Sequence, residues 1–370
     1  MRVFVAGASG AVGNRLVPLL VSAGHSVVGL THTPANADAI RRAGGEAAVV
    51  DALNRAAMVK AVVIAEPDVV VHEMTSLSAA NDLRKFDQSF AVTNRLRTEG
   101  LDNLLAAAKQ AETRRVVAQS FCGWPYARIG GPVKSEDDPF DPEPPPELRR
   151  TLRAIRYLEN GVTASSEIDG IVLRYGAFYG HGTGLFDGPM IGQLRRGRVP
   201  LIGDANGWWS FVHINDAAAA TAIAVERGAP GIYNIVDDDP APVGQWLPAL
   251  AAMLGARPPR HIPKWLARIV AGEHLVTLMT EARAGSNAKA KRDLSWQPTH
   301  ASWPQRGLGG SVPAWMTRRS PSWRHGFGLS SAPDQKLLPH VRGHDRLSSK
   351  DRQSPPVTGT NSPSIWGATI

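Results

Sequence analysis

Three glycines near the start of the chain have the spacing of a turn that receives a phosphate group. Gly7, Gly10 and Gly13 lie between an apolar run and an amphipathic run. Glycine permits a tight turn and a close approach of the backbone to a pyrophosphate, and the N–H groups that open the next helix face the anion. The turn therefore predicts a dinucleotide site; the alternative is a turn kept by the fold without a ligand. The predicted contacts here are Gly7, Ser9, Gly10, Ala11, Val12 and Gly13.

The residues after the second apolar run indicate which dinucleotide binds. An acidic side chain at this position binds the ribose hydroxyls of NAD, whereas a basic one accommodates the 2′-phosphate of NADP. The sequence has Thr31 and His32 here and no acid, and Arg41 and Arg42 follow in the next predicted helix. We therefore predict NADP, bound in part by Thr31 and His32, with NAD as the second candidate.

Asp51 and Ala52, which follow the third apolar run, are also predicted to line the cofactor site. A residue at this strand end lies near the adenine edge of a dinucleotide in a doubly wound sheet. The alternative for Asp51 is an ordinary loop cap.

The spacing of apolar residues predicts strands that alternate with helices. Short β-branched runs recur between Ala- and Leu-rich stretches, which is the pattern of a parallel sheet with crossover helices. Near-continuous apolar runs such as "DVVVH" suit a sheet that is covered on both faces. The predicted strands are 2–6, 26–30, 47–50, 68–72, 115–119, 170–174 and 232–235. The predicted helices are 11–23, 35–43, 54–65, 93–111, 147–160, 187–196, 215–227 and 243–254.

The distribution of charge argues against a nucleic-acid-binding function. The net charge is +8, but residues 305–370 hold nine Lys/Arg and three Asp, or +6, which leaves +2 for residues 1–304. A nearly neutral folded part offers no basic groove. From about residue 309 the chain loses both apolar periods and is rich in Pro, Gly and Ser, so we expect a disordered tail over 309–370.

The sequence also indicates the cellular compartment in which the protein is expected to fold. A single cysteine, Cys122, excludes an intrachain disulfide and fits a reducing, cytoplasmic setting. No signal peptide is recognised, and no stretch has the uninterrupted apolar length of a membrane span. The best apolar candidate, 262–283, carries charged side chains and is predicted to be one amphipathic helix.

Several reactive side chains have an ordinary structural interpretation. His213 and Asp216 suit a loop contact and a helix cap better than catalysis. Cys122 has no base near it in the sequence and is expected to be a buried thiol. His72 and Glu73 are adjacent, but no second ligand pair has suitable spacing, so no metal site is predicted.

Together these motifs resemble the extended short-chain dehydrogenase/reductases, also called NAD-dependent epimerase/dehydratases. The resemblance covers about 1–308 and rests on "GASGAVG", Asp51, "VVVHEMTS", "EGLDNLLAAA", "LRYGAFYG", "FVHINDAAAA" and "LSWQP". It implies an α/β Rossmann-type doubly wound parallel sheet with a smaller C-terminal substrate domain. The implied division is 1–175 with about 211–240 for NAD(P), 176–308 mainly for substrate, and the 309–370 tail. Met74 and Thr75, within "VVVHEMTS", are implied cofactor contacts.

The sequence departs from the family at the residues that move protons. The family uses a Ser together with a Tyr-x-x-x-Lys pair, in which the Lys lowers the pKa of the phenol. Ser120 matches the Ser, although another alignment favours Cys122. Thr151 and Ile155 stand at the Tyr and Lys positions, and neither can do that work. Tyr157 lies about 240° around the helix from Thr151 and cannot replace the phenol.

Replacement chemistry is expected from residues that reach the predicted cleft. Tyr126 and Tyr179 are the candidate phenols, with Ser120 polarising a carbonyl group. Trp208 and Trp209 stand where sugar-nucleotide members place an Arg, which indicates a flatter, more apolar ligand or simple core packing.

The sequence therefore predicts an NAD(P)-dependent oxidoreductase that acts on a small carbonyl or alcohol compound and lacks the usual pair. The expected partner is a small-molecule substrate, with no nucleic acid and no membrane, and a homodimer stays open. The alternative function is a non-catalytic protein that senses NAD(P) or binds a partner.

Overall fold

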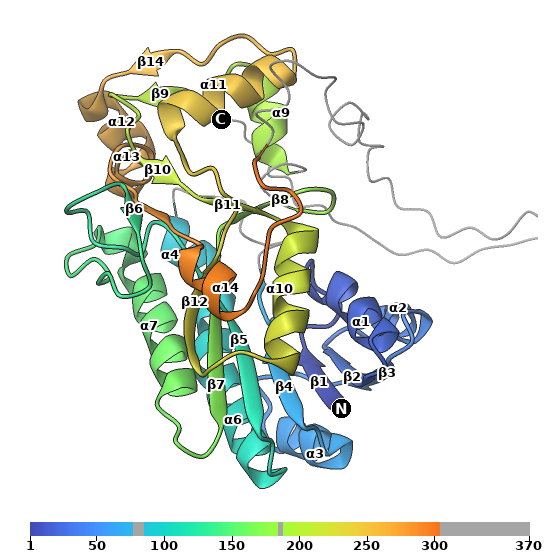
Figure 1. Cartoon of the computed structure of the whole chain (residues 1–370). Helices are drawn as coiled ribbons and strands as arrows, with labels where there is room; N and C mark the ends of the chain where they lie inside the picture. The colour runs from blue at the N-terminus through green and yellow to red at the C-terminus, as the bar shows by residue number, and fades with distance from the viewer. Residues whose placement is uncertain (77–84, 184–187, 304–370) are drawn as a thin grey trace, which may run out of the picture. The chain divides into compact units, whose positions relative to one another are not determined.

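A parallel sheet of seven strands forms the centre of the fold (Figure 1). The computed structural model describes residues 1–76, 85–183 and 188–303. The strands follow the order β12-β7-β5-β4-β1-β2-β3, and all neighbours are parallel. They are β1 (Arg2–Ala6), β2 (Ser26–Thr31), β3 (Glu46–Val49), β4 (Val69–His72), β5 (Arg115–Phe121), β7 (Asp169–Tyr175) and β12 (Gly231–Ile235). The predicted α/β doubly wound fold and its strands are confirmed.

The order of the strands reverses between β1 and β4. Ala6 of β1 lies opposite Leu30 of β2 on one side and opposite His72 of β4 on the other. In a doubly wound sheet a crevice opens at such a point, outside the carboxyl ends of the strands. The glycine turn begins at the residue after Ala6 and therefore lies at the mouth of this crevice.

Helices cover both faces of the sheet because the side chains of each strand alternate between two apolar cores. Val3 and Val5 of β1 belong to one core, and Phe4 and Ala6 belong to the other. The first face is covered by α1 (Gly13–Ser22), α2 (Ala37–Arg42) and α10 (Ile214–Glu226); the second is covered by α3 (Arg55–Ala65), α6 (Leu101–Gln110) and α7 (Arg149–Thr163).

Most of the smaller elements gather beyond the carboxyl ends of the strands (Figure 1). Phe211, Trp246 and Trp303 belong to their core. The short strands are β6 (Val133–Lys134), β8 (Ala177–Tyr179), β9 (Leu201–Ile202), β10 (Trp208–Trp209), β11 (Phe211–His213), β13 (Ala241–Pro242), β14 (His261–Ile262) and β15 (Ala284–Gly285). The helices are α4 (Phe86–Ser89), α5 (Ala91–Arg95), α9 (Pro189–Arg195), α11 (Val243–Met253), α12 (Lys264–Ala271), α13 (Glu273–Thr280) and α14 (Ala288–Asp293).

Two predicted helices differ from the structure. The prediction of one helix over 262–283 is wrong, because Gly272 separates α12 from α13 with φ +91° and ψ 160°, a conformation that favours glycine and ends a helix. The predicted helix over 93–111 is divided into α5 and α6 by a π-helical turn, Leu96–Gly100.

None of the helices in the described part of the chain has both the length and the apolar character needed to cross a membrane. The predicted tail, 309–370, lies outside the described residues.

Candidate dinucleotide site and catalytic positions

The glycine turn has the geometry that a pyrophosphate needs. Gly7 has φ +99°, and a Cβ on it would lie 2.5 Å from the backbone oxygen of Glu73. A Cβ on Gly13 would lie 2.3 Å from the backbone oxygen of Gly7, so both positions require glycine for packing. Gly10 is exposed just before the start of α1. Backbone is therefore open to a ligand at a helix N-terminus, and the turn fits an NAD(P) group.

The end of β2 contributes one inward and one outward side chain. Thr31 is buried, and its Oγ1 lies 3.2 Å from Ser9 Oγ and accepts the Thr33 N–H at 3.2 Å. This hydroxyl pair links β2 to the glycine turn. His32 is exposed. His32 is therefore the better placed of the two for a phosphate group, and its contact with a 2′-phosphate stays a prediction.

The other four predicted cofactor contacts flank the crevice after β3 and β4. Asp51 is exposed and its Oδ1 accepts the Leu53 N–H at 3.0 Å, which is the loop cap that the sequence left as its alternative. Ala52 and Met74 are buried, and Thr75 is half-buried. Their contact with a cofactor stays a prediction.

Ser120 belongs to a buried ion-pair network at the end of β5. Its hydroxyl donates to Glu159 Oε1 at 2.6 Å, and Arg174 donates from Nε and Nη2 to the two oxygens of Glu159 at 2.8 and 2.6 Å. All three side chains are buried. The Ser120 proton is therefore committed to a carboxylate, and a role in polarising a substrate carbonyl stays a prediction.

The two candidate phenols also have partners inside the protein. The Tyr126 hydroxyl donates to Asn234 Oδ1 at 2.8 Å and accepts from Arg174 Nη1 at 3.0 Å. The Tyr179 hydroxyl donates to the His300 carbonyl at 3.1 Å. Burial raises the pKa of both phenols above their ordinary value, so neither is tuned to release a proton near neutral pH.

The position of the family's Tyr is closed off by α4. The Thr151 hydroxyl donates to Asp87 Oδ1 at 2.6 Å, and the Thr151 N–H donates to the same atom at 2.8 Å. Asp87 also accepts the Arg150 N–H at 2.9 Å and so satisfies backbone donors in the first turn of α7. Ile155, at the position of the family's Lys, is buried. Neither side chain is placed to transfer a proton to a ligand.

Three other side chains named in the sequence have structural environments. Cys122 is buried, and burial raises the pKa of its thiol to about 12, which agrees with an inert thiol. The Tyr157 hydroxyl donates to Asp102 on α6 at 2.8 Å. The Trp209 ring packs 5.2 Å from the Trp246 ring, as the core-packing alternative predicts.

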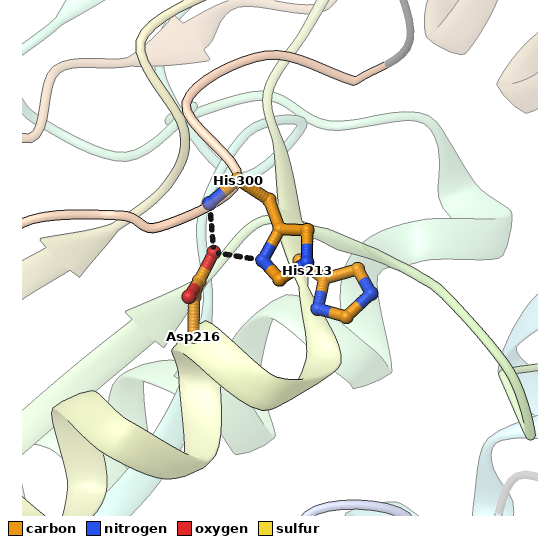
Figure 2. Close-up of side chains that lie close together, drawn as sticks. All are labelled: His213, Asp216 and His300. Carbon is orange, nitrogen blue, oxygen red and sulfur yellow. Dashed lines mark hydrogen bonds and ion pairs between the residues drawn. The ribbon is translucent and has the colours of Figure 1, made fainter. Parts of the chain in front are cut away.

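His213, Asp216 and His300 lie together where β11 passes into α10 (Figure 2). Nδ1 of His213 accepts the Asn215 N–H at 3.3 Å, so His213 supplies the predicted cap of α10. Asp216 accepts the N–H groups of Thr299 and His300 at 3.1 and 2.9 Å, His300 Nδ1 at 3.0 Å and the Thr299 hydroxyl. The predicted loop contact is confirmed.

The stacked arrangement of the two histidine rings does not suit a metal ion. The rings of His213 and His300 stack with centroids 3.6 Å apart and planes 17° apart. Nitrogen lone pairs lie in the ring planes, so stacked rings cannot converge on one ion. Burial lowers the pKa of His213 to about 4, which keeps that ring neutral near pH 7. We interpret the cluster as a clasp, formed by His213, Asp216, Thr299 and His300, that fixes residues 299–300 to α10.

Sequence reasoning missed the environment of Glu73, which follows β4. Glu73 is 5% exposed, its Oε1 accepts from the Tyr175 hydroxyl at 2.8 Å, and Tyr175 lies 2.6 Å from Thr221 Oγ1. Oε2 has no partner among the described residues. Burial raises the pKa of Glu73 to about 8. One sequence feature could have indicated this environment: Glu73 is an acidic residue directly after an apolar parallel strand, and both faces of that sheet are covered by helices.

Comparison with known protein families identifies the family of this chain. The model of the NAD dependent epimerase/dehydratase family matches residues 3–236. The chain belongs to this family. The resemblance inferred from the motifs is thereby confirmed, and an NAD(P) cofactor is typical of epimerase/dehydratase proteins.

Several relatives that are similar in sequence are named as reductases. A Streptomyces protein named 3-diazoavenalumate denitrifying reductase is 43% identical over 311 residues, which cover 84% of this chain and 99% of the relative. A Stigmatella aurantiaca protein named 4-hydroxy-2-methyl-3-oxo-4-farnesyl-3,4-dihydroquinoline-1-oxide ketoreductase is 26% identical, covering 77% of this chain and 84% of the relative. These relatives support an NAD(P)-dependent reductase that acts on a small compound.

Solved structures of the family share the fold. A dTDP-glucose 4,6-dehydratase from Streptomyces venezuelae, with NAD and TYD bound, has a TM-score of 0.65 at 20% identity and covers 85% of this chain and 96% of its own. A UDP-glucose 4-epimerase from Thermus thermophilus, in complex with NAD, has a TM-score of 0.62 at 22% identity and covers 81% and 94%.

Proposed function

We propose that this protein is an NADPH-dependent reductase that replaces the diazo group of a small aromatic compound with hydrogen and releases N2. The substrate class comes from the 43% identical Streptomyces relative, whose name describes a diazo compound and a denitrifying reduction. The observation in this chain that carries the proposal is the absence of a proton-donating pair on α7, where Thr151 is bonded to Asp87 and Ile155 is apolar.

A carbonyl substrate would need this missing pair. Reduction of a carbonyl group consumes a hydride and a proton, and the family's Tyr supplies the proton. The hydroxyls of Ser120, Tyr126 and Tyr179 all donate to acceptors inside the protein. A reaction that requires no proton from the protein suits this arrangement better.

An arenediazonium ion meets that requirement. Bound NADPH supplies a hydride. The C–N bond of ArN2⁺ breaks with its electron pair leaving on N2, and the hydride pair forms the new C–H bond. Atoms and charge balance to ArH and N2 without a proton. The chain then has to bind, orient and shield the reactants, which does not require acid–base catalysis.

We propose NADPH rather than NADH as the preferred cofactor. The end of β2 carries no acid, and an acid there would repel a 2′-phosphate. His32 is exposed at this strand end, whereas Thr31 is buried and its hydroxyl lies 3.2 Å from Ser9 Oγ. Two solved structures of similar fold contain NAD. NADH is therefore the cofactor against which NADPH binding is compared.

Deuterium transfer tests the proposed reaction. The full-length protein is incubated with an arenediazonium salt and NADPH carrying deuterium at C4, and the arene is analysed by mass spectrometry. We expect deuterium at the carbon that carried nitrogen, with one NADPH consumed for each N2 released. The matched control is Gly10→Val, whose branched side chain would obstruct the pyrophosphate and remove turnover. Label transfer no faster than in protein-free mixtures would contradict the proposal.

The predicted catalytic hydroxyls separate diazo reduction from carbonyl reduction. Ser120→Ala, Tyr126→Phe and Tyr179→Phe should each retain diazo reduction within a few-fold once folding is verified. A carbonyl reductase would lose about a hundredfold when its proton donor is removed. Turnover of aldehydes, ketones or quinones with that loss would return the function to the carbonyl class. Tight NADPH binding without oxidation by either class would favour the non-catalytic alternative.

A further inference from the structure

The residue after β4 is a buried carboxyl group with one oxygen that has no partner. Tyr175 donates to Glu73 Oε1 at 2.8 Å, while Oε2 is without a hydrogen bond among the described residues. An unpartnered buried oxygen is unfavourable, and the penalty is larger for a charged carboxylate than for a neutral carboxyl group. Such an atom in a family that binds a dinucleotide indicates a partner supplied by the ligand.

The topology brings Glu73 to one side of the dinucleotide crevice. Its backbone oxygen lies 2.5 Å from the place that a Cβ on Gly7 would occupy, so it adjoins the glycine turn. β4 borders β1 on the side away from β2. Since β2 selects the adenosine ribose in a doubly wound sheet, the nicotinamide half extends over β4 and beyond.

The same face carries other polar groups at the carboxyl ends of β5 and β7. His72 lies opposite Ala118, so Glu73 extends next to Gln119, and Tyr175 is the last residue of β7. Phe178 packs 5.3 Å from the Tyr175 ring and also against Val12 of the glycine turn. The Glu73–Tyr175 pair thus lies beneath the region where the nicotinamide half is expected.

Groups packed around Glu73 are uncharged near pH 8. Tyr175 has a pKa well above its ordinary value because of burial, and Thr221 on α10 does not titrate. Gln119 on β5 is an amide. His72, the neighbour on β4, faces the other core, and burial lowers its pKa.

The charged side chains of α1 and α10, which pack on this face, have partners elsewhere. Arg15 of α1 donates to Asn215 Oδ1 and to the Ala11 carbonyl. On α10, Asp216 belongs to the clasp and Glu226 lies 3.0 Å from His25.

We propose that Glu73 is a cofactor-positioning residue whose protonated carboxyl group donates a hydrogen bond from Oε2 to the nicotinamide half of the dinucleotide. The proposal rests on the cofactor of the proposed function and not on its substrate. A proton on Glu73 also removes the repulsion between a carboxylate and the pyrophosphate. Its pKa of about 8 is consistent with a carboxyl group that keeps its proton at pH 7.

Binding measured against pH tests the proposal. We expect the Kd for NADPH to be constant from pH 7 to about 8 and to rise about tenfold per unit beyond, reaching about thirtyfold near pH 9.5. Glu73→Gln should bind NADPH with no such rise, because glutamine stays neutral. Asp237→Asn is the matched control, since Asp237 also has a pKa near 8 but lies after β12. This control should retain the rise.

A shortened ligand assigns the contact to one half of the cofactor. 2′,5′-ADP has the 2′-phosphate but no nicotinamide half, so its Kd should not follow the titration of Glu73. A flat NADPH profile in the wild type, a rise that persists in Glu73→Gln, or the same rise with 2′,5′-ADP would each overturn the proposal.

Proton uptake provides a second readout that needs no variant. Calorimetry at about pH 8.5 in two buffers of different ionisation enthalpy should show uptake of about three quarters of a proton as NADPH binds. Binding without uptake would overturn the proposal even if Glu73→Gln fails to fold. These measurements contain no diazo compound, so their outcome is separate from that of the deuterium experiment.

Discussion

Glu159 and Glu73 represent two ways in which this protein accommodates a buried carboxyl group. Glu159 has a guanidinium on both oxygens and a hydroxyl donor, which offset the loss of water around a charge. Glu73 has a single phenol donor and no cation, and burial raises its pKa to about 8. The first arrangement holds β5, α7 and β7 together, whereas the second leaves Oε2 without a hydrogen bond among the described residues.

Glu73→Gln should stabilise the protein without cofactor in a pH-dependent way. Glu73 titrates near 4.5 in the unfolded chain and near 8 in the folded one, so the folded state retains a proton that the unfolded state has lost. Stability therefore falls as pH rises between these values, by as much as about 4 kcal/mol at pH 7.5. Denaturant unfolding at pH 5 and 7.5 should show a larger gain for Glu73→Gln at pH 7.5. A gain of equal size at both pH values would contradict this account.

The elements of this protein were more predictable than its side-chain network. Periodicity indicated the strands and most helices because it records which residues face an apolar core. The bonds Ser120–Glu159, Thr151–Asp87 and His300–Asp216 join residues 39, 64 and 84 positions apart. Periodicity carries no information about such pairs, so the sequence identified Ser120 and Thr151 without their partners. It missed the division at Gly272 because the apolar pattern continues across it.

His32→Asp should change the cofactor preference at the end of β2. The exposed imidazole lies at the strand end that adjoins the 2′-position of the adenosine ribose in a doubly wound sheet. An aspartate there would repel a 2′-phosphate and accept hydrogen bonds from ribose hydroxyls. The ratio of the NADH and NADPH dissociation constants should therefore reverse in the variant. His32→Asn controls for the loss of the ring without added charge, and an unchanged ratio would refute the assignment.

At the scale of the whole molecule, residues 299–303 connect the sheet face to the smaller elements. Asp216 holds Thr299 and His300, and Asp237 accepts the Trp303 N–H at 2.9 Å. Trp303 is buried with Phe211 and the aromatic core. The last described residues are therefore an integral part of the fold.

Two truncations test this boundary. A chain that ends at Gly310 should bind NADPH and keep its Tm within a few degrees, because it retains every contact described above. A chain that ends at Pro298 loses the clasp and the burial of Trp303, which is worth about 3 kcal/mol or more. Its Tm should fall by at least several degrees. Equal melting of the two truncations, or aggregation of the longer one alone, would show that the boundary is misplaced.

The contact of Asp87 with Thr151 makes it unfavourable for this protein to acquire the family's Tyr-x-x-x-Lys pair by single substitutions. A tyrosine at position 151 would have to find space at a buried site and would leave Asp87 without its hydroxyl donor. A lysine at position 155 would place an ammonium group at a buried site. Each reverse step is unfavourable alone, and neither restores proton transfer without the other. Selection acting on single substitutions would therefore keep α7 of this protein without the Tyr-x-x-x-Lys pair, whatever new substrates the protein acquires.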